Sequence, residues 1–146
     1  MVARILAATV AGGVAFFILG FVIYGLILDP MVMKPNMNTY PGLMIDPPVW
    51  VPLVLANMVS ALLLAYIFEK WAGIRTFMGG LQGGAVVFFL IALSFQLMFA
   101  AFMNLAKNYT PAIADVLGST VMGALGGGVI GAVLGMMSKG SATSGD

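Results

Sequence analysis

The most informative part of this chain is residues 116–138, which read VLGSTVMGALGGGVIGAVLGMMS. Small residues recur in it every four positions, at Ser119, Gly123, Gly127, Gly131 and Gly135. Because positions four apart lie on one face of a helix, the stretch predicts a helix with a groove almost free of side chains. Such a groove lets a second helix approach closely in lipid. We therefore expect these five residues to pack helices together, in the manner of a glycine zipper.

The energetic cost of these glycines supports the same interpretation. The stretch holds seven of them, and each costs about 1 kcal/mol relative to alanine in an aqueous helix, or about 7 kcal/mol in total. A bilayer lowers this cost, because an unpaired backbone in hydrocarbon is worse than glycine in a helix. Close contact on the glycine face is the expected compensation. The alternative is a loose helix with no partner on that face.

Composition predicts a membrane protein. Of the 146 residues, 62 % are hydrophobic and only 8 % are charged, which is more apolar surface than a soluble domain of this size can hide. A net charge of +1 gives no reason to expect nucleic acid as a partner. Cysteine and histidine are both absent, which removes disulfides, the commonest metal ligand and the commonest general base.

The charged residues delimit four apolar segments. Uncharged runs of 24, 22, 31 and 23 residues follow Arg4, Asp46, Arg75 and Asp115. Since about 20 apolar residues cross a bilayer, we expect an all-α integral membrane bundle of four transmembrane helices, at about 4–28, 51–70, 77–104 and 113–137. They form one domain, residues 1–138, followed by a disordered tail, 139–146. The first run is too long for a signal peptide and is expected to be retained.

A loop rich in proline and methionine is expected between the first two helices, on the outer side. Six of the seven prolines lie in residues 29–52, and prolines at this density oppose a continuous helix. Tyr40 and Trp50 would anchor the loop near the headgroups, with the loop folded over the mouth of the bundle or against a neighbour. Thioether ligands for Cu(I) are present at Met31, Met33, Met37 and Met44. Methionine is also a general apolar filler, and no metal or cofactor is expected.

Two further expectations concern the packing of the last helix. Ala8, Gly12 and Gly20 form a second stripe of small residues, broken by Phe16, which we expect to dock the glycine face. Asp115 stands near the expected start of the last helix, where a carboxylate would complement the exposed amides and the helix dipole.

Lysine and arginine indicate the orientation. Four of them are expected on the side of the termini and two on the other side, so the positive-inside tendency places both termini in the cytoplasm. The first group is Arg4, Lys70, Arg75 and Lys139, and the second is Lys34 and Lys107.

Few side chains inside the spans could carry chemistry. The uncharged polar candidates are Asn57, Ser60, Ser94 and Gln96. The ordinary explanation is that they form hydrogen bonds between helices. The functional alternative is that they line a polar path for a solute. No catalytic residues are evident, because the carboxylates are scattered among the helix ends and no nucleophile motif occurs. The sequence predicts no enzyme.

Three short motifs carry a resemblance to a known family. They are GFVIYG at residues 20–25, LAYIF at 64–68 and WAGIRTFMGG at 71–80. Together they resemble small four-helix bacterial membrane proteins of the Bacteroidetes type, a domain of unknown function. The resemblance covers most of the chain and implies a bacterial inner-membrane location, but no activity and no site.

Two functions from different classes remain open. The first is a structural or accessory subunit that packs against a larger membrane complex or against copies of itself, in the lipid bilayer. The second is a small homo-oligomeric transporter or channel for a neutral or apolar solute, supported by the polar residues and by a faint repeat between the two halves of the chain. We favour the first, because no reactive constellation is evident.

Overall fold

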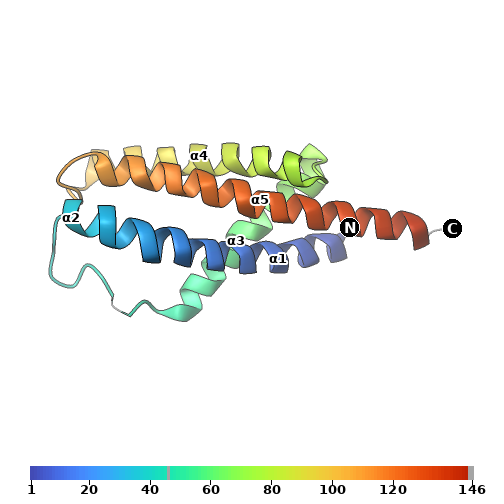
Figure 1. Cartoon of the computed structure of the whole chain (residues 1–146), viewed down its shortest axis with the longest axis horizontal. Coiled ribbons are helices and arrows are strands. Elements are labelled where there is room, and N and C mark those ends of the chain that lie inside the picture. Colours follow the sequence, from blue (N-terminus) through green and yellow to red (C-terminus); the bar gives the residue numbers. More distant parts are fainter. Residues whose placement is uncertain (46, 145–146) are drawn as a thin grey trace.

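The structure, a computed structural model, describes residues 1–45 and 47–144, without the side chains of residues 141–144. The described residues form long helices, with an isolated β-bridge between Met37 and Ala106 (Figure 1). Four helical segments are long and apolar enough to cross a membrane. The expected fold class, an all-α integral membrane bundle of four helices, is confirmed.

The first helix is longer than expected from the prolines that follow residue 28. Its parts α1 (Val2–Gly20), η1 (Phe21–Met33) and α2 (Lys34–Asn36) follow one another without a break. The expected end near residue 28 and the expected irregular chain from Asp29 are therefore wrong. The reason is the π-helical geometry of η1, whose wider turns accommodate Pro30 and its missing N–H.

The second helix consists of α3 (Trp50–Tyr66) and η2 (Ile67–Ala72). Gly73 ends it in the left-handed conformation (φ 66°), which glycine adopts without a steric penalty. The next helix, α4 (Phe77–Phe102), begins four residues later. Thr76 caps it, because its hydroxyl oxygen accepts a hydrogen bond from the Gly79 amide at 3.0 Å.

The last helix, α5 (Thr110–Ser144), extends beyond the expected range at both ends. α5 continues through residues 139–144 of the expected disordered tail, and residues 145–146 lie outside the described part. Once a helix has formed, each added residue gains a backbone hydrogen bond without a new nucleation cost, so the apolar helix can propagate into a weak helix-forming segment. The early start places Asp115 in the second turn, so its expected capping position is also wrong.

The helices pack in a defined order. α1 contacts both α3 and α5, while α4 contacts α5 along most of its length, and α3 runs obliquely to the others (Figure 1). The buried apolar core lies among α1, α3, η2 and α5. Its members are Ile5, Ala8, Phe16, Ala61, Leu64, Ala65, Phe68, Ile130 and Leu134.

The start of α1 and the end of α5 lie at the same end of the bundle in Figure 1, which we call the terminal end, and the chain after α2 and the connection 103–109 mark the opposite loop end. At the loop end the Lys107 amide donates to the Asn36 carbonyl, and the Asn38 amide donates to the Leu105 carbonyl, each at 2.8 Å. The Tyr40 hydroxyl also donates to the Asn104 carbonyl. The first part of the loop is therefore tied to the bundle, whereas the chain beyond it extends away before α3 (Figure 1).

Candidate functional site

The glycine face of α5 lies against the first half of α4. A methyl group added at Gly127 would overlap the Gly80 carbonyl oxygen and lie 2.9 Å from the Cα atom of Gly84. The α4 backbone likewise faces Gly123 and Gly131, while Gly135 faces the backbone of Arg75, just before α4. The two backbones therefore meet without intervening side chains, a spacing that only glycine permits. The expectation that this face docks on α1 is wrong, because α4 occupies it.

The stripe on α1 meets a different side of α5. A methyl group added at Gly12 would lie 2.5 Å from Cγ1 of Ile130, and the same addition at Gly20 would contact Met122 at 3.6 Å. Phe16, which interrupts the stripe, fills the space left by Gly126. Its ring also stacks on Phe88 of α4, with 5.1 Å between ring centroids. Large residues of one helix thus fit the small residues of the next.

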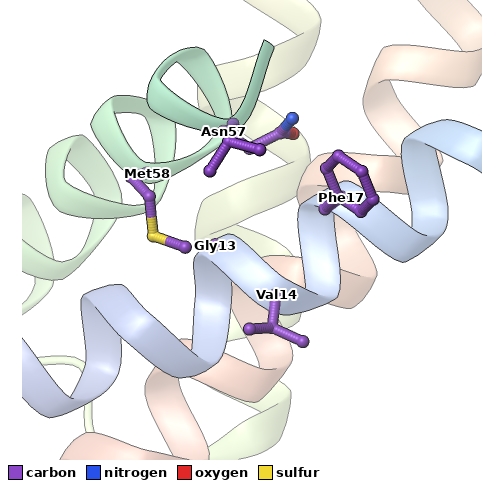
Figure 2. A pocket seen from close by; sticks show the side chains of 6 residues that line it. Gly13, Val14, Phe17, Asn57 and Met58 are labelled. Carbon is purple, nitrogen blue, oxygen red and sulfur yellow. The ribbon is translucent and has the colours of Figure 1, made fainter. Parts of the chain in front are cut away.

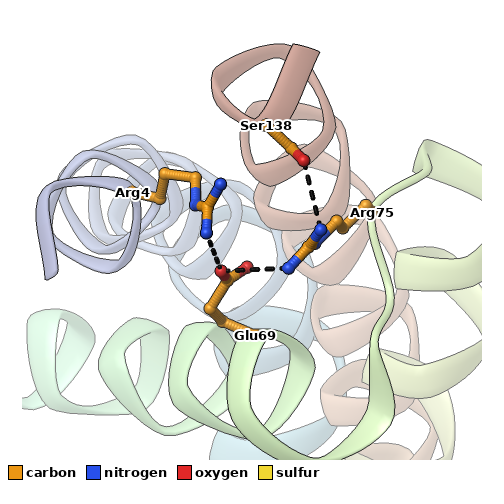
Figure 3. A network of polar contacts seen from close by, with 4 residues as sticks. All are labelled: Arg4, Glu69, Arg75 and Ser138. Atoms are coloured by element: carbon orange, nitrogen blue, oxygen red, sulfur yellow. Dashed lines mark hydrogen bonds and ion pairs between the residues drawn. The ribbon is translucent and has the colours of Figure 1, made fainter. Parts of the chain in front are cut away.

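A charged cluster joins four parts of the chain at the terminal end (Figure 3). Oε1 of Glu69, in η2, accepts from Arg4 of α1 at 2.8 Å and from Arg75, which precedes α4, at 3.2 Å. Arg75 also donates to the Ser138 hydroxyl of α5 at 3.1 Å. The charged cluster, Arg4, Glu69, Arg75 and Ser138, therefore ties together all four helical segments.

The ion pairs of the charged cluster matter for stability because the Glu69 carboxylate is buried. The Glu69 side chain has no exposed surface, whereas those of Arg4 and Arg75 are 17 % and 40 % exposed. A carboxylate taken out of water costs several kcal/mol unless cations and hydrogen bonds compensate it. Two arginines supply that compensation at Oε1, while Oε2 is buried without a protein hydrogen-bond partner. The cluster can hold helices together, and its outer guanidinium can face headgroups.

A second polar group, the tyrosine cluster of Tyr24, Gln96, Asp115 and Ser119, lies toward the loop end. The Tyr24 hydroxyl of η1 donates to Oδ1 of Asp115 at 2.9 Å and lies 2.6 Å from the Ser119 hydroxyl. The Gln96 amide of α4 donates to the other carboxylate oxygen, Oδ2, at 2.7 Å. Three helices therefore converge on one carboxylate. Ser119, expected only as a packing residue, also belongs to this polar contact.

The four residues expected to line a polar path are not brought together. Asn57 and Ser60 are on α3 and Ser94 and Gln96 are on α4, two helices that do not pack closely against each other. The Asn57 amide donates to the Leu53 carbonyl of its own helix at 2.8 Å. Ser94 is exposed on the outer surface, and Gln96 is bonded to Asp115.

One pocket opens between α1 and α3, with a volume of about 220 Å³ (Figure 2). Apolar side chains line nearly all of it, and Asn57 is the polar residue among them. A shallow apolar space of this kind can hold a lipid chain or a side chain of another protein. Within the part of the chain that the structure describes, no group of three or more acidic residues is placed to share a metal ion.

Sequence reasoning missed the pairing of Glu69 with two arginines and the role of Tyr24. One available signal was the four-residue spacing of Asp115 and Ser119, which places both on one helix face. The pairing of Glu69 depends on three chain segments far apart in sequence, so no local pattern marks it. In comparisons with known proteins, no family model, no curated protein and no solved structure matches this chain.

Proposed function

We propose that this protein is a non-catalytic structural or accessory subunit of a membrane assembly, which packs against a larger complex or against copies of itself. The observation that carries the proposal is the outer face of α4. In the most apolar window of this helix only 6 % of the residues are buried within the chain. The exposed face carries large side chains, among them Val86, Phe89, Leu90 and Leu97.

The internal contacts support the same function. The charged cluster, the tyrosine cluster and the glycine contact all join helices of this chain to one another. Side chains committed to internal bonds build a rigid element and leave little for a reaction. Aromatic side chains on a rigid helix are suited to contacts with another membrane protein, since they bury much area at low entropic cost.

The proposed location is a bacterial inner membrane, with both termini in the cytoplasm. Three of the basic residues expected on that side, Arg4, Arg75 and Lys70, lie in or next to the charged cluster at the terminal end. The resemblance to the Bacteroidetes-type family supports the same location. The positive-inside tendency supports this orientation.

The alternative, a homo-oligomeric transporter for a neutral or apolar solute, draws less support. Its proposed path needs Asn57 and Gln96 to face a common space, whereas one bonds its own helix and the other bonds Asp115. The pocket beside Asn57 is lined almost entirely by apolar groups.

A cross-linking experiment tests the structural function. The chain has no cysteine, so single cysteines can be placed at Val86 on the outer face of α4 and, as a control, at Val10 on α1. These residues are 57 % and 59 % exposed. After cross-linking in the native membrane, the complex is extracted in mild detergent and its intact mass is measured.

The expected result is a cross-linked species from Val86→Cys and little from Val10→Cys. A mass of two chains identifies self-association, and a mass that includes another protein identifies an accessory subunit. A monomeric product from both variants, together with a monomeric mass for the extracted protein, would contradict the proposal.

A further inference from the structure

The charged cluster at the terminal end carries more positive than negative charge. Two arginines share one carboxylate, with Arg4 at 2.8 Å and Arg75 at 3.2 Å from Oε1 of Glu69, and the two guanidinium groups lie on either side of it (Figure 3). One positive charge is therefore left unbalanced within the cluster. Of the acidic residues that the structure describes, Glu69 alone lies at this end, because Asp29 in η1 and Asp115 in α5 lie toward the loop end.

The outer side of the cluster presents arginine rather than the carboxylate. The Glu69 side chain has no exposed surface, whereas that of Arg75 is 40 % exposed. Arg75 donates through one nitrogen to Glu69 and through another to Ser138, and a guanidinium has more N–H groups than these two bonds use. Lys70, the next residue after Glu69 in η2, is also exposed and takes part in none of the ion pairs of the described residues. An anion at this surface would meet donors from both side chains.

Aromatic and apolar side chains surround the cluster. Trp71 is 74 % exposed, and its ring stands edge-on against that of Tyr66, with 5.6 Å between the ring centroids. Phe77 and Met78, in the first turn of α4, are also exposed. Tryptophan and tyrosine are enriched where headgroups meet acyl chains. This end of the bundle therefore places a positively charged surface directly beside an apolar one.

We propose that the charged cluster and Lys70 form a binding site for an anionic phospholipid. Its phosphate oxygens accept hydrogen bonds from the Arg75 guanidinium and pair with the Lys70 ammonium, while its acyl chains lie along Trp71 and Phe77. Basic groups between transmembrane helices are suited to such headgroups, because the lipid supplies the missing negative charge. This inference does not depend on the proposed structural function.

A phospholipid fits this surface better than an acidic segment of another protein does. An acidic segment that approaches from water would pair with the basic groups but leave Trp71 and Met78 uncovered. A phospholipid covers both parts, since its headgroup and its acyl chains are joined in one molecule. Arginine also matches the geometry of a phosphate, to which it can donate two parallel hydrogen bonds.

Quenching of tryptophan fluorescence by brominated lipids tests the proposal, because bromine quenches only the rings that it touches. The chain has two tryptophans, so Trp50→Phe leaves Trp71 as the reporter at the terminal end. Trp71→Phe leaves Trp50, which is 55 % exposed at the start of α3, as the matched control. Each variant is placed in liposomes of phosphatidylcholine and phosphatidylglycerol in one fixed ratio. The phosphatidylglycerol carries the bromine in one preparation, and an equal amount of the phosphatidylcholine carries it in the other.

The expected result is stronger quenching of Trp71 by brominated phosphatidylglycerol than by brominated phosphatidylcholine, and equal quenching of Trp50 by both. Equal quenching of Trp71 by the two lipids would overturn the proposal, and so would the same preference at both tryptophans, because the anionic lipid would then surround the chain without a site. Liposomes prepared with inorganic phosphate in place of chloride, at equal ionic strength, should show the same preference. Its loss would identify a site for a free anion and overturn the lipid proposal.

Substitutions of basic residues assign the preference to this surface. Lys70→Gln should lower the preference at Trp71 by up to about fivefold, the effect of one basic residue near an anionic surface. Lys34→Gln, whose side chain is 73 % exposed toward the loop end, is the matched control and should leave the preference unchanged. Arg75→Lys keeps a positive charge beside Glu69 but loses the planar fork, so it should also lower the preference. Because Lys70 is exposed, its variant decides the test even where Arg75→Lys fails to fold. An unchanged preference in Lys70→Gln would overturn the proposed site.

Discussion

Glu69 is the only glutamate in the sequence, and its carboxylate is fully buried between two arginines. A buried ion pair adds little stability over an apolar replacement, but removal of one partner leaves the other charge uncompensated. Because Arg4 and Arg75 both bind the same oxygen of Glu69, the end of η2 is held in place relative to α1 and the start of α4. The main contribution of Glu69 is therefore to specify how these helices are arranged, rather than to add net stability.

Glu69→Gln should destabilise the bundle strongly. The amide cannot balance Arg4 and Arg75, and we expect a loss of about 3 kcal/mol, at the lower end of the range for broken buried pairs because Arg75 is partly exposed. Thermal unfolding in detergent measures the change. Asp29→Asn breaks an exposed pair with Lys34 at 3.6 Å and should cost less than about 1 kcal/mol. Equal stability losses in the two variants would contradict this account.

The two amides of the polar candidates should behave differently on mutation. Gln96→Leu removes the hydrogen bond to Oδ2 of Asp115 and should cost about 1.5–3 kcal/mol, the range for bonds to charged groups. Asn57→Leu removes only a bond to the Leu53 carbonyl, which keeps its helical partner, so stability should be nearly unchanged. Unfolding of both variants in the same detergent gives the comparison. A larger loss of stability in Asn57→Leu than in Gln96→Leu would contradict this assignment and would show that Asn57 makes a further contact.

The contact between α4 and α5 is the closest helix pair of the bundle, and it tolerates no side chain at its centre. Gly127→Ala places a methyl group against the Gly80 carbonyl and should cost about 1–3 kcal/mol, the usual cost of overpacking. Gly140→Ala is the matched control, since nothing lies within 4 Å of an added methyl group there. It should stabilise the helix by up to about 1 kcal/mol. If Gly127→Ala is as stable as Gly140→Ala, the two backbones are not in contact.

The spacing of the glycines predicted which face of α5 is used, but not which helix uses it. A close partner needs small residues of its own at matching positions, and Gly80 and Gly84 provide them at the start of α4. That pair is visible in the sequence, as are Gly12 and Gly20 on α1. The choice between the two helices depends on how all four pack together, as with Phe16, which fills the gap at Gly126.

The ends of the helices were harder to predict than their existence. Pro30 is a strong local signal for a helix end, yet the π-helical turns of η1 carry the helix through it to Asn36. Bonds from the loop end, such as that of the Lys107 amide to the Asn36 carbonyl, hold this extension in place. Such bonds join residues far apart in the chain, so local propensity does not reveal them.

The two polar clusters set the position of the whole bundle in the bilayer. Arg4 and Tyr24 are 20 residues apart in one continuous helix, or about 30 Å, which matches the hydrocarbon core. We therefore expect the charged cluster near one interface and the tyrosine cluster near the other. The first helix continues for a further twelve residues to Asn36, so the loop end projects beyond a core of this thickness.

The even number of spans predicts that the two termini share one side and that the loop after α2 lies on the other. Single cysteines at Gly140 and at Met44, which is 81 % exposed, test this directly in a chain without natural cysteine. A membrane-impermeant maleimide added to intact cells should label Met44→Cys at once, and should label Gly140→Cys only after permeabilisation. The physical reason is the basic residues at the terminal end, which resist translocation. The reverse pattern would invert the orientation while keeping the fold, whereas labelling of both sites in intact cells would contradict four crossings.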